Sequence, residues 1–324
     1  MADAVILKHH GGPEELRLES VEVGRPRAGE LLLRQTAAGV NYHDVYVRSG
    51  LYKTLTLPRI PGIEAVGRIE AMGEGVTGFK VGERVAYVSA GYGGYASART
   101  LPASLTTRLP ETLSDAAAAA SWMKALTVCM LVRHVHSVRP GETVLVHAAA
   151  GGVGQLLCSW ASHLGARVIG TVGNRAKIEI AKRAGASEVI LYHEEAFPER
   201  VAAITAGEGV AAAYDSVGEA TFLGSMQCLG YGGILVNFGQ SSGAVSPFAP
   251  SLLATRSLSV ARPIIFHYLR TPAMLRAMAD DVVAAFEKGV IRPIQPIELP
   301  IAEAAEAHRL LEAGKSPGGI VLIP

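Results

Sequence analysis

The 324-residue sequence has few cysteines, few aromatic residues and almost no net charge. Its three cysteines, Cys129, Cys158 and Cys228, stand alone in apolar surroundings. This pattern predicts buried thiols in a reducing compartment rather than disulfides, and therefore a cytoplasmic location. A formal charge of +1 and 6% aromatic residues give no reason to expect nucleic acid or an anionic membrane as the main partner.

Long apolar runs are also missing. The apolar run near the N-terminus is too short for a signal peptide, and the alanine run from Ala116 to Ala120 is soon interrupted by Lys124. The sequence therefore predicts neither secretion nor a membrane span. Its length exceeds the roughly 250–300 residues at which a single core stops growing, and 49% of its residues are hydrophobic. We expect two domains with ample cores.

The segment from Thr143 to Gly173 carries the clearest motif. A short apolar run, VLV, is typical of a strand covered on both faces, and Gly151, Gly152, Val153 and Gly154 follow it as a tight turn. A helix from Gln155 to Leu164, capped by Gly165, and a strand from Arg167 to Thr171 complete the unit. Strand, glycine turn, helix and strand in this order predict a dinucleotide site, with the phosphates at the N-terminus of the helix.

A carboxylate that would select NAD is absent from the expected place. Such sites carry an Asp or Glu about 20 residues after the glycines, yet no acid occurs between Gln155 and Ile178. The second strand is followed instead by Gly173, Asn174, Arg175 and, two residues later, Lys177. Cations here suit a 2'-phosphate and favour NADPH over NADH. The alternative for each cation is a solvated residue at the start of a helix.

The hydrophobic pattern changes along the chain and predicts an α/β fold. The first 110 or so residues contain short strand-like runs broken by Gly and Pro, which indicate a β-rich lobe. After Ser114 and Asp115, helices alternate with buried strands of a doubly wound parallel sheet. Another helix, Ala273–Lys288, precedes strand-like pieces that could return to the first lobe. The expected sheet strands are Thr143–Ala148, Arg167–Thr171, Glu188–Leu191, Ala211–Asp215 and Gly233–Phe238.

The whole chain resembles the quinone oxidoreductase (zeta-crystallin-like) group of the zinc-independent medium-chain dehydrogenase/reductase superfamily. The resemblance rests on GVNYHDVYVRSGLY (39–52), PGIEAVGRI (61–69), HAAAGGVG (147–154), YDSVG (214–218) and FGQSSGAV (238–245). It implies a GroES-like catalytic domain formed by residues 1–122 and 263–324, and a Rossmann NADPH-binding domain formed by residues 123–262. In this family the active site is the cleft between the two domains.

Zinc ligands of the related alcohol dehydrogenases are replaced in this chain. The resemblance places Asn41 where those enzymes carry a Cys, and Ile63 where they carry the His of a Gly-His-Glu motif. Four clustered cysteines for a structural site are missing too. His43 and Glu64 remain as stray candidate ligands, but we expect no metal. Alcohol oxidation would lose its Lewis acid, whereas hydride transfer to an electrophilic quinone or activated alkene needs none.

The resemblance implies that Asn41, Asp44, Tyr46 and Tyr52 line the cleft, with Asn41 on the nicotinamide side. Tyr52 is the preferred proton donor, because related enoyl reductases use a tyrosine in the matching Gly-x-Tyr position. For a quinone, water can protonate the reduced oxygens. The alternatives are aromatic packing for the two tyrosines and a turn-forming role for Asp44.

Further cofactor contacts are implied by matching segments, most of them at the carboxyl ends of strands, where doubly wound sheets bind ligands. They are Lys124, Thr127, Tyr192, Ser216, Phe238, Gly239 and Ser241. Relatives carry an Arg after Leu-Glu-x near the C-terminus, whereas this chain has Lys315 beyond Leu311 and Glu312. Lys315 could supply a weaker contact in its place.

Three functions stay open at this point. The first is an NADPH:quinone reductase, and the second is an NADPH-dependent alkenal or enoyl reductase. The third is a nucleotide-binding structural or RNA-binding protein, which the low net charge supports little. The family implies a homodimer, for which Ser257–Ile265 is a plausible edge strand.

Overall fold

The computed structural model describes residues 1–316 and 318–324, and they divide into two compact units. Met1–Lys124, Leu269–Glu287 and Pro293–Pro324 form unit 1, and Ala125–Tyr268 with Lys288–Arg292 form unit 2. The sequence prediction broke the chain after residues 122 and 262 and left Lys288–Arg292 in the first domain. That segment belongs to unit 2, where Ser159 Oγ of helix α3 (Gly152–His163) donates a hydrogen bond of 2.7 Å to the Val290 carbonyl.

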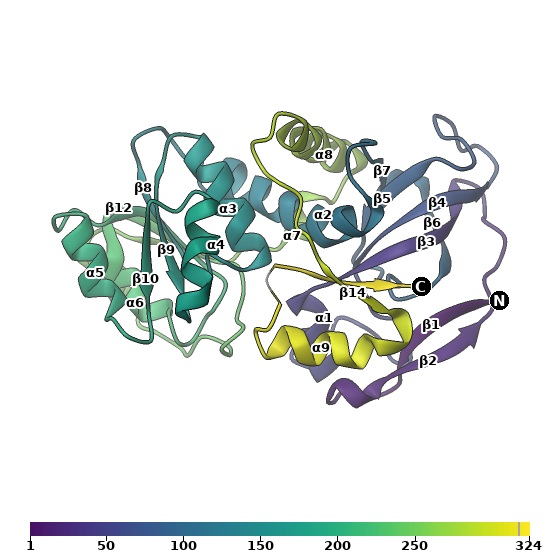
Figure 1. The fold of residues 1–324 in the computed structure, drawn as a ribbon, viewed down its shortest axis with the longest axis horizontal. Coiled ribbons are helices and arrows are strands. Elements are labelled where there is room, and N and C mark those ends of the chain that lie inside the picture. Colours follow the sequence, from purple (N-terminus) through teal and green to yellow (C-terminus); the bar gives the residue numbers. More distant parts are fainter. Residues whose placement is uncertain (317) are drawn as a thin grey trace. The chain divides into compact units, whose positions relative to one another are not determined.

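Unit 1 is built on a seven-stranded sheet with the order β14-β15-β3-β4-β5-β7, in which β6 also pairs with β3 (Figure 1). Strand β15 pairs antiparallel with β3, so the end of the chain returns to the first lobe. A separate antiparallel pair joins β1 (Ala2–Leu7) to β2 (Leu16–Val21). The strands of the large sheet are β3 (Glu30–Val40), β4 (Glu64–Met72), β5 (Arg84–Val88), β6 (Ala98–Pro102), β7 (Thr106–Arg108), β14 (Ile297–Pro300) and β15 (Ile320–Ile323).

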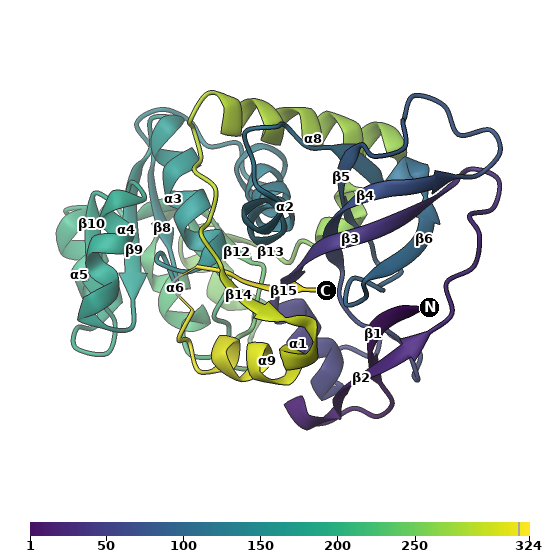
Figure 2. The same cartoon turned by 45° about the vertical axis from the view of Figure 1, so that its right-hand side comes forward.

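Two short helices of unit 1, α1 (Tyr42–Ser49) and α9 (Ala304–Glu312), lie side by side although they come from opposite ends of the chain (Figures 1 and 2). Helix α1 begins at a capping box formed by Asn41 and Asp44 and ends at Gly50, whose φ of 83° suits glycine. Helix α9 buries Ala304, Ala307 and His308, a spacing that forms one helical face. The sequence interpretation had no helix at either place.

Helix α8 (Pro272–Glu287) matches the predicted helix within one residue at each end, and its buried residues lie on one face. Helix α2 (Asp115–Cys129) continues into a π-helical turn, η3 (Met130–Val135). The combined helix is long and apolar enough to cross a membrane, but 78% of its apolar window is buried within the protein. Such burial is typical of a core helix, so length and composition are weak evidence for a span here.

Unit 2 is a six-stranded sheet in which the paired strands all run parallel, in the order β10-β9-β8-β11-β12-β13. This order, with two strands on one side of the first strand and three on the other, is that of a Rossmann sheet. The doubly wound prediction is confirmed. The strands are β8 (Thr143–Val146), β9 (Arg167–Val172), β10 (Glu188–Leu191), β11 (Val210–Asp215), β12 (Leu229–Asn237) and β13 (Ser259–Ala261).

Helices pack on the sheet of unit 2 in pairs. Helix α3 contacts α4 (Ile178–Arg183), and α5 (Phe197–Ile204) contacts α6 (Phe222–Cys228). Phe197, Val201 and Phe222 form one core with inward residues of the strands, such as Leu145 and Leu235. Strands buried on both faces explain why the predicted apolar runs of this unit do not alternate with polar residues.

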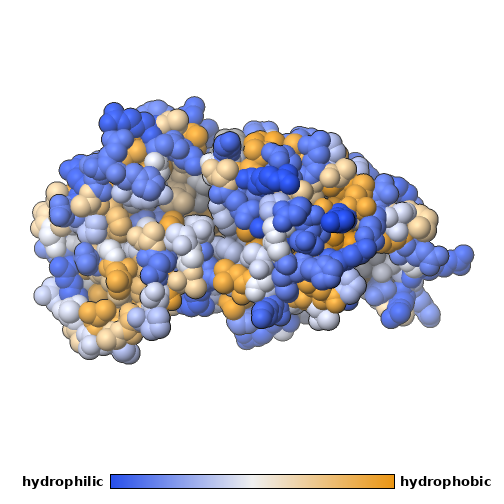
Figure 3. All heavy atoms as spheres, turned by 90° about the horizontal axis from the view of Figure 1, so that it is seen from below, coloured by the Kyte–Doolittle hydropathy of each residue, from blue (hydrophilic) through white to orange (hydrophobic). Residues whose placement is uncertain are grey.

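The surface and the cysteines agree with the composition. On the face drawn in Figure 3, hydrophobic residues lie in small groups among hydrophilic ones. Tyr231 of β12 is the most exposed of the large hydrophobic residues that the structure describes, at 87%. Cys129, Cys158 and Cys228 are buried thiols, and burial raises the pKa of both Cys158 and Cys228 to about 12. These two thiols are therefore unreactive at neutral pH.

Candidate functional site

The glycine-rich turn of unit 2 brings helix α3 unusually close to strand β8. A Cβ on Gly154 would lie only 2.2 Å from the Ala148 carbonyl oxygen, so no other residue fits without moving the backbone. Ala148 itself adopts a positive φ of 50°, a strained conformation for alanine that tightens the turn. Helix α3 begins at Gly152 after the N-cap Gly151, and its first turn has neither an acidic residue nor a side-chain cap. Its amides are thus available to an anion.

A buried histidine at the start of this turn is fixed by hydrogen bonds on both sides of its ring. His147 follows β8 directly; its Nδ1 lies 2.9 Å from Thr171 Oγ1, and its Nε2 lies 2.8 Å from Ser225 Oγ. Because Ser225 donates its own proton to the Thr221 carbonyl, Nε2 carries the hydrogen and Nδ1 accepts from Thr171. Burial lowers the pKa of His147 to about 4, so the ring is neutral. The signal in the sequence was a polar residue directly after a fully apolar strand.

The residues expected around a 2'-phosphate gather at the carboxyl ends of β9 and β10. A Cβ on Gly173 would lie 3.1 Å from the Tyr192 hydroxyl, so this tyrosine lies over the glycine. Asn174 begins the short 3-10 turn η4 (Arg175–Lys177). A carboxylate that the sequence interpretation missed also lies here, because Glu194 makes two hydrogen bonds with Arg175. It comes from the loop after β10, outside the segment that was searched for an acid.

The loops after the neighbouring strands β11 and β12 are hydrogen-bonded to each other. The Ser241 amide donates to the Ser216 carbonyl at 3.3 Å, and the Phe238 amide donates to the Asp215 carbonyl at 2.8 Å. Gly239 packs so tightly on Ser216 that a Cβ would lie 2.6 Å from its carbonyl oxygen.

Thr127 is nearly buried and belongs to unit 2, whereas Lys124 belongs to unit 1.

A buried amide occupies the centre of the polar site in unit 1. Asn41 Nδ2 donates to Glu64 Oε1 at 2.7 Å, and Lys124 Nζ donates to Asn41 Oδ1 at 3.1 Å. The second oxygen of Glu64 accepts from the Met123 amide at 2.9 Å. A Cβ on Gly39 would lie 2.3 Å from Glu64 Oε1, so glycine is required where this carboxylate lies. The amide is therefore held in one orientation between a cation and an anion.

Burial changes the acidity of both charged partners of Asn41. Desolvation raises the pKa of Glu64, while Lys124, Asn41 and the Met123 amide act against this rise. Desolvation lowers the pKa of Lys124, and Glu64 and Asp44 oppose that change. Groups with altered acidity in one buried cluster are typical of a functional site, although ion-pair networks alone also produce them.

Asp44, which the resemblance places in the cleft, lies in a buried hydrogen-bond network. Its side chain is fully buried, and Oδ2 accepts from the Asn41 amide at 2.9 Å and from the Tyr95 hydroxyl at 3.2 Å. No described residue donates to Oδ1. Burial raises the pKa of Asp44 to about 7; the Asn41 amide, Tyr95 and Lys124 oppose this rise, and Glu64 adds to it. Asp44 thus positions Asn41 through the capping box.

The two tyrosines of the predicted site pack on each other. The rings of Tyr46 and Tyr52 lie 5.0 Å apart at 62°, and His43 packs edge-on to Tyr52 at 5.6 Å. Tyr46 is nearly buried, whereas Tyr52 is half-buried. His43 Nε2 lies 3.2 Å from the Tyr92 hydroxyl, and burial lowers the pKa of His43 to about 4. Among the described residues, no three His, Cys, Asp or Glu side chains cluster as metal ligands.

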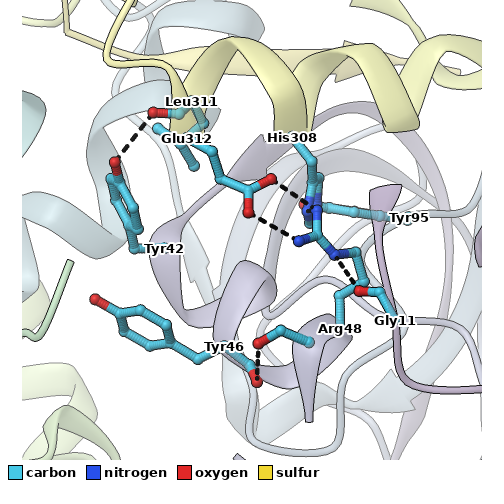
Figure 4. Close-up of polar contacts among 9 residues, drawn as sticks. Gly11, Tyr42, Tyr46, Arg48, Tyr95, His308, Leu311 and Glu312 are labelled. Carbon is cyan, nitrogen blue, oxygen red and sulfur yellow. Dashed lines mark hydrogen bonds and ion pairs between the residues drawn. The ribbon is translucent and has the colours of Figure 1, made fainter. Parts of the chain in front are cut away.

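A polar chain that the sequence interpretation missed joins α1 to α9 (Figure 4). Arg48 of α1 makes two hydrogen bonds of 2.9 Å to Glu312 and a third of 3.1 Å to the Gly11 carbonyl. Its guanidinium also lies 3.3 Å from His308 Nδ1, and His308 Nε2 lies 3.1 Å from the Tyr95 hydroxyl. These residues are far apart in sequence, so no local pattern indicated that they meet.

The hydrogen bonds from Arg48 to Asp44 run in one direction, because an arginine side chain can only donate. Arg48 donates to His308 Nδ1, so Nε2 carries the hydrogen and donates to Tyr95, whose hydroxyl in turn donates to Asp44. Burial and the positive charge of Arg48 lower the pKa of His308 to about 3, in agreement with a neutral ring. Lys315 is not one of the residues in this hydrogen-bond network. It lies on the exposed segment after the end of α9.

Two family models match the chain, an alcohol dehydrogenase GroES-like domain over residues 27–111 and a zinc-binding dehydrogenase domain over residues 152–280. A quinone oxidoreductase of Pseudomonas aeruginosa is 40% identical over the full length of both chains. A 2-haloacrylate reductase of a Burkholderia species is 37% identical over 100% of this chain and 99% of its own.

Solved structures agree with the sequence relatives. The Escherichia coli quinone oxidoreductase in complex with NADPH superimposes with a TM-score of 0.96 at 39% identity, over 99% of this chain and 100% of that one. Full-length identity at this level, together with the GroES-like and Rossmann domains, shows that the chain belongs to the quinone oxidoreductase group of the medium-chain dehydrogenase/reductase superfamily.

Proposed function

We propose that this protein is an NADPH-dependent reductase of small quinones that works without zinc. The observation that carries the proposal is the Asn41 amide, held between Lys124 and Glu64 at the position of a zinc ligand in the related alcohol dehydrogenases. An amide is a poor ligand for zinc, which prefers thiolate, imidazole and carboxylate. It is a good hydrogen-bond donor to an oxygen that gains negative charge.

The residues of unit 2 fit NADPH. The close approach at Gly154 opens the N-terminus of α3 to a pyrophosphate, and Arg175 and Lys177 supply positive charge after β9. The Tyr192 hydroxyl over Gly173 adds a donor beside them. We assign the adenosine end of the cofactor to these residues, and we assign further contacts to Ser216, Phe238, Gly239 and Ser241.

NADPH, when bound, supplies the hydride, and a quinone accepts it without a Lewis acid. Lys124 fixes the amide of Asn41 through Oδ1, and Glu64 takes one hydrogen of Nδ2. We propose that the second hydrogen of Nδ2 and the ammonium of Lys124 stabilise the oxygen of the quinone as it becomes negative. Fixed donors of this kind lower a barrier because they need no reorganisation.

A steady-state assay tests the main proposal. The purified protein, treated with a chelator, should oxidise NADPH with 1,4-benzoquinone and should use NADH much less well. Tight binding of NADPH without reduction of a quinone or an alkene would refute both enzymatic proposals and favour a nucleotide-binding role.

A second candidate is the reduction of an activated carbon–carbon double bond. The 2-haloacrylate reductase among the relatives supports it, as does the half-buried Tyr52, which could act as a proton donor. Tyr52→Phe should then lower the reduction of 2-chloroacrylate about a hundredfold and leave quinone reduction unchanged. The exposed Tyr231→Phe is the matched control, and equal loss with both acceptors would argue against a proton-donor role.

We further propose a homodimer in the cytoplasm. Strand β13 lies at the edge of the six-stranded sheet, and the neighbouring Ile264 is exposed, which supports pairing with a second copy. The buried thiols support a reducing compartment. Light scattering should give twice the chain mass, and Ile264→Glu should shift it toward the monomer; a monomeric wild type would refute the dimer.

A further inference from the structure

The ion pair between Arg175 and Glu194 spans the ends of two neighbouring strands. Strands β9 and β10 run parallel with Val172 opposite Leu191, so both end at the same edge of the sheet. Arg175 is the third residue after β9, and Glu194 is the third residue after β10. Nε and Nη2 of Arg175 lie 3.1 and 2.7 Å from the two oxygens of Glu194.

The carboxylate of Glu194 occupies one of the two-pronged donor edges of Arg175, the edge formed by Nε and Nη2. Guanidinium binds carboxylate and phosphate in the same two-pronged geometry, through the same N–H groups. Arg175 lowers the pKa of Glu194, so this side chain stays ionised at neutral pH and opposes a second anion. Both side chains face solvent, at 78% and 47% exposure, and an ion pair in water exchanges its partners readily.

We propose that Glu194 is a specificity-determining residue. It pairs with Arg175 in the protein without cofactor, and the 2'-phosphate of NADPH replaces it at Arg175. This inference rests on the proposed NADPH function. A 2'-phosphate that binds Arg175 through Nε and Nη2 must replace this carboxylate and then lie close to its negative charge. NADH has no 2'-phosphate and leaves the pair in place. Glu194 therefore reduces the preference for NADPH below the level that the cations alone would give.

The test measures the binding of two small probes to the full-length protein by calorimetry. The first probe, 2',5'-ADP, carries the 2'-phosphate, and the second, 5'-AMP, does not. Glu194→Gln should tighten 2',5'-ADP about three- to tenfold, the size expected for removing one exposed charge, and change 5'-AMP less than twofold. Glu195→Gln is the matched control, because the adjacent Glu195 pairs with Arg200 at 2.8 Å and not with Arg175.

A double variant shows whether Glu194 acts through Arg175. In an Arg175→Gln background, Glu194→Gln should no longer tighten 2',5'-ADP. If the gain persists there, Glu194 acts only as a distant negative charge, and the exchange is refuted. If the wild type prefers 2',5'-ADP but Glu194→Gln changes nothing, the inference fails and the NADPH function stands. If the wild type does not prefer 2',5'-ADP over 5'-AMP, the NADPH proposal itself fails.

Discussion

The two units differ in how much charge they bury at their candidate sites. Unit 1 buries Arg48, Asp44, Glu64 and Lys124 within one connected network, and each has a fixed partner. Unit 2 buries the neutral ring of His147 and one carboxylate, Asp215, which accepts from the Val217 amide and the Thr221 hydroxyl, and it leaves the charges near the expected 2'-phosphate exposed. Buried charges are fixed in place before a reaction, whereas exposed charges can exchange partners when a ligand binds. This difference agrees with the proposal that unit 1 stabilises the quinone and that unit 2 binds the anionic cofactor.

The largest effect should come from removing Arg48, the buried partner of the Arg48–Glu312 ion pair of unit 1. Arg48→Ala leaves Glu312 and His308 without their donor, and Arg48 itself is only 3% exposed. Because the buried His308 Nδ1 and the Gly11 carbonyl each lose a donor, we expect a loss of roughly 3 kcal/mol in the free energy of unfolding, measured by urea denaturation. Arg34→Ala removes an exposed pair with Glu70 and should cost less than about 1 kcal/mol. Equal losses would show that burial does not distinguish the two pairs.

Asn41→Ala should have the next largest effect, on catalysis. The variant loses the amide between Lys124 and Glu64, so kcat/KM for the quinone should fall about a hundredfold. The Kd for NADPH should change little, because the phosphate-binding residues lie in unit 2. Quinone kinetics and NADPH fluorescence titration measure the two effects separately. An unchanged kcat/KM would contradict the proposed role of the amide.

The acidity of Asp44 gives unit 1 a characteristic pH dependence. Its pKa is raised to about 7 in the folded protein from 3.8, so between these values the folded state holds a proton that the unfolded chain has lost. Asp44 therefore makes stability fall as pH rises from about 4 to about 7, by at most about 1.4 kcal/mol per pH unit. Asp44→Asn should flatten this slope in urea denaturation at several pH values. Part of the slope should remain in this variant, because the pKa of Glu64 is also raised.

The opposite slope is expected from His147 in unit 2. Its pKa falls from 6.5 to about 4 on folding, so its contribution is complete above pH 6.5 and is lost as pH falls toward 4. His147→Gln should reduce this acid sensitivity, and the exposed His193→Gln should not. His43 and His308 also have lowered pKa values, so their share of the acid sensitivity should remain in the His147→Gln variant. An acid sensitivity that is identical in His147→Gln and in the wild type would contradict a neutral buried ring.

The sequence predicted unit 2 better than unit 1 for a physical reason. The glycine turn and its flanking strands lie within about 30 residues, and their apolar runs report burial directly. The strand Glu188–Leu191 was predicted to the residue, whereas β8 ends at Val146, two residues early, because His147 starts the turn. The Arg175–Glu194 pair escaped prediction because it joins two different strand ends.

In unit 1 the sequence indicated Asn41 but not its partners. The resemblance implied that Asn41, Asp44, Tyr46 and Tyr52 lie together. In the structure, Asn41 and Asp44 form the capping box at the start of α1, and the ring of Tyr52 packs on Tyr46. The resemblance did not indicate the surroundings of Asp44, because only the fold shows that Tyr95 and the capping box enclose its side chain. The chain through Arg48, His308 and Glu312 connects residues about 260 positions apart.

The sequence by itself determined the layer architecture, the dinucleotide turn and the loss of the zinc ligands. These properties depend on local spacing and on residue type at single positions, such as Gly154 and Asn41. Only the tertiary structure decided which charges are buried, which way the hydrogen bonds run and which carboxylate meets Arg175. Desolvation and hydrogen-bond direction depend on every group around a side chain, and folding gathers those groups from distant parts of the chain.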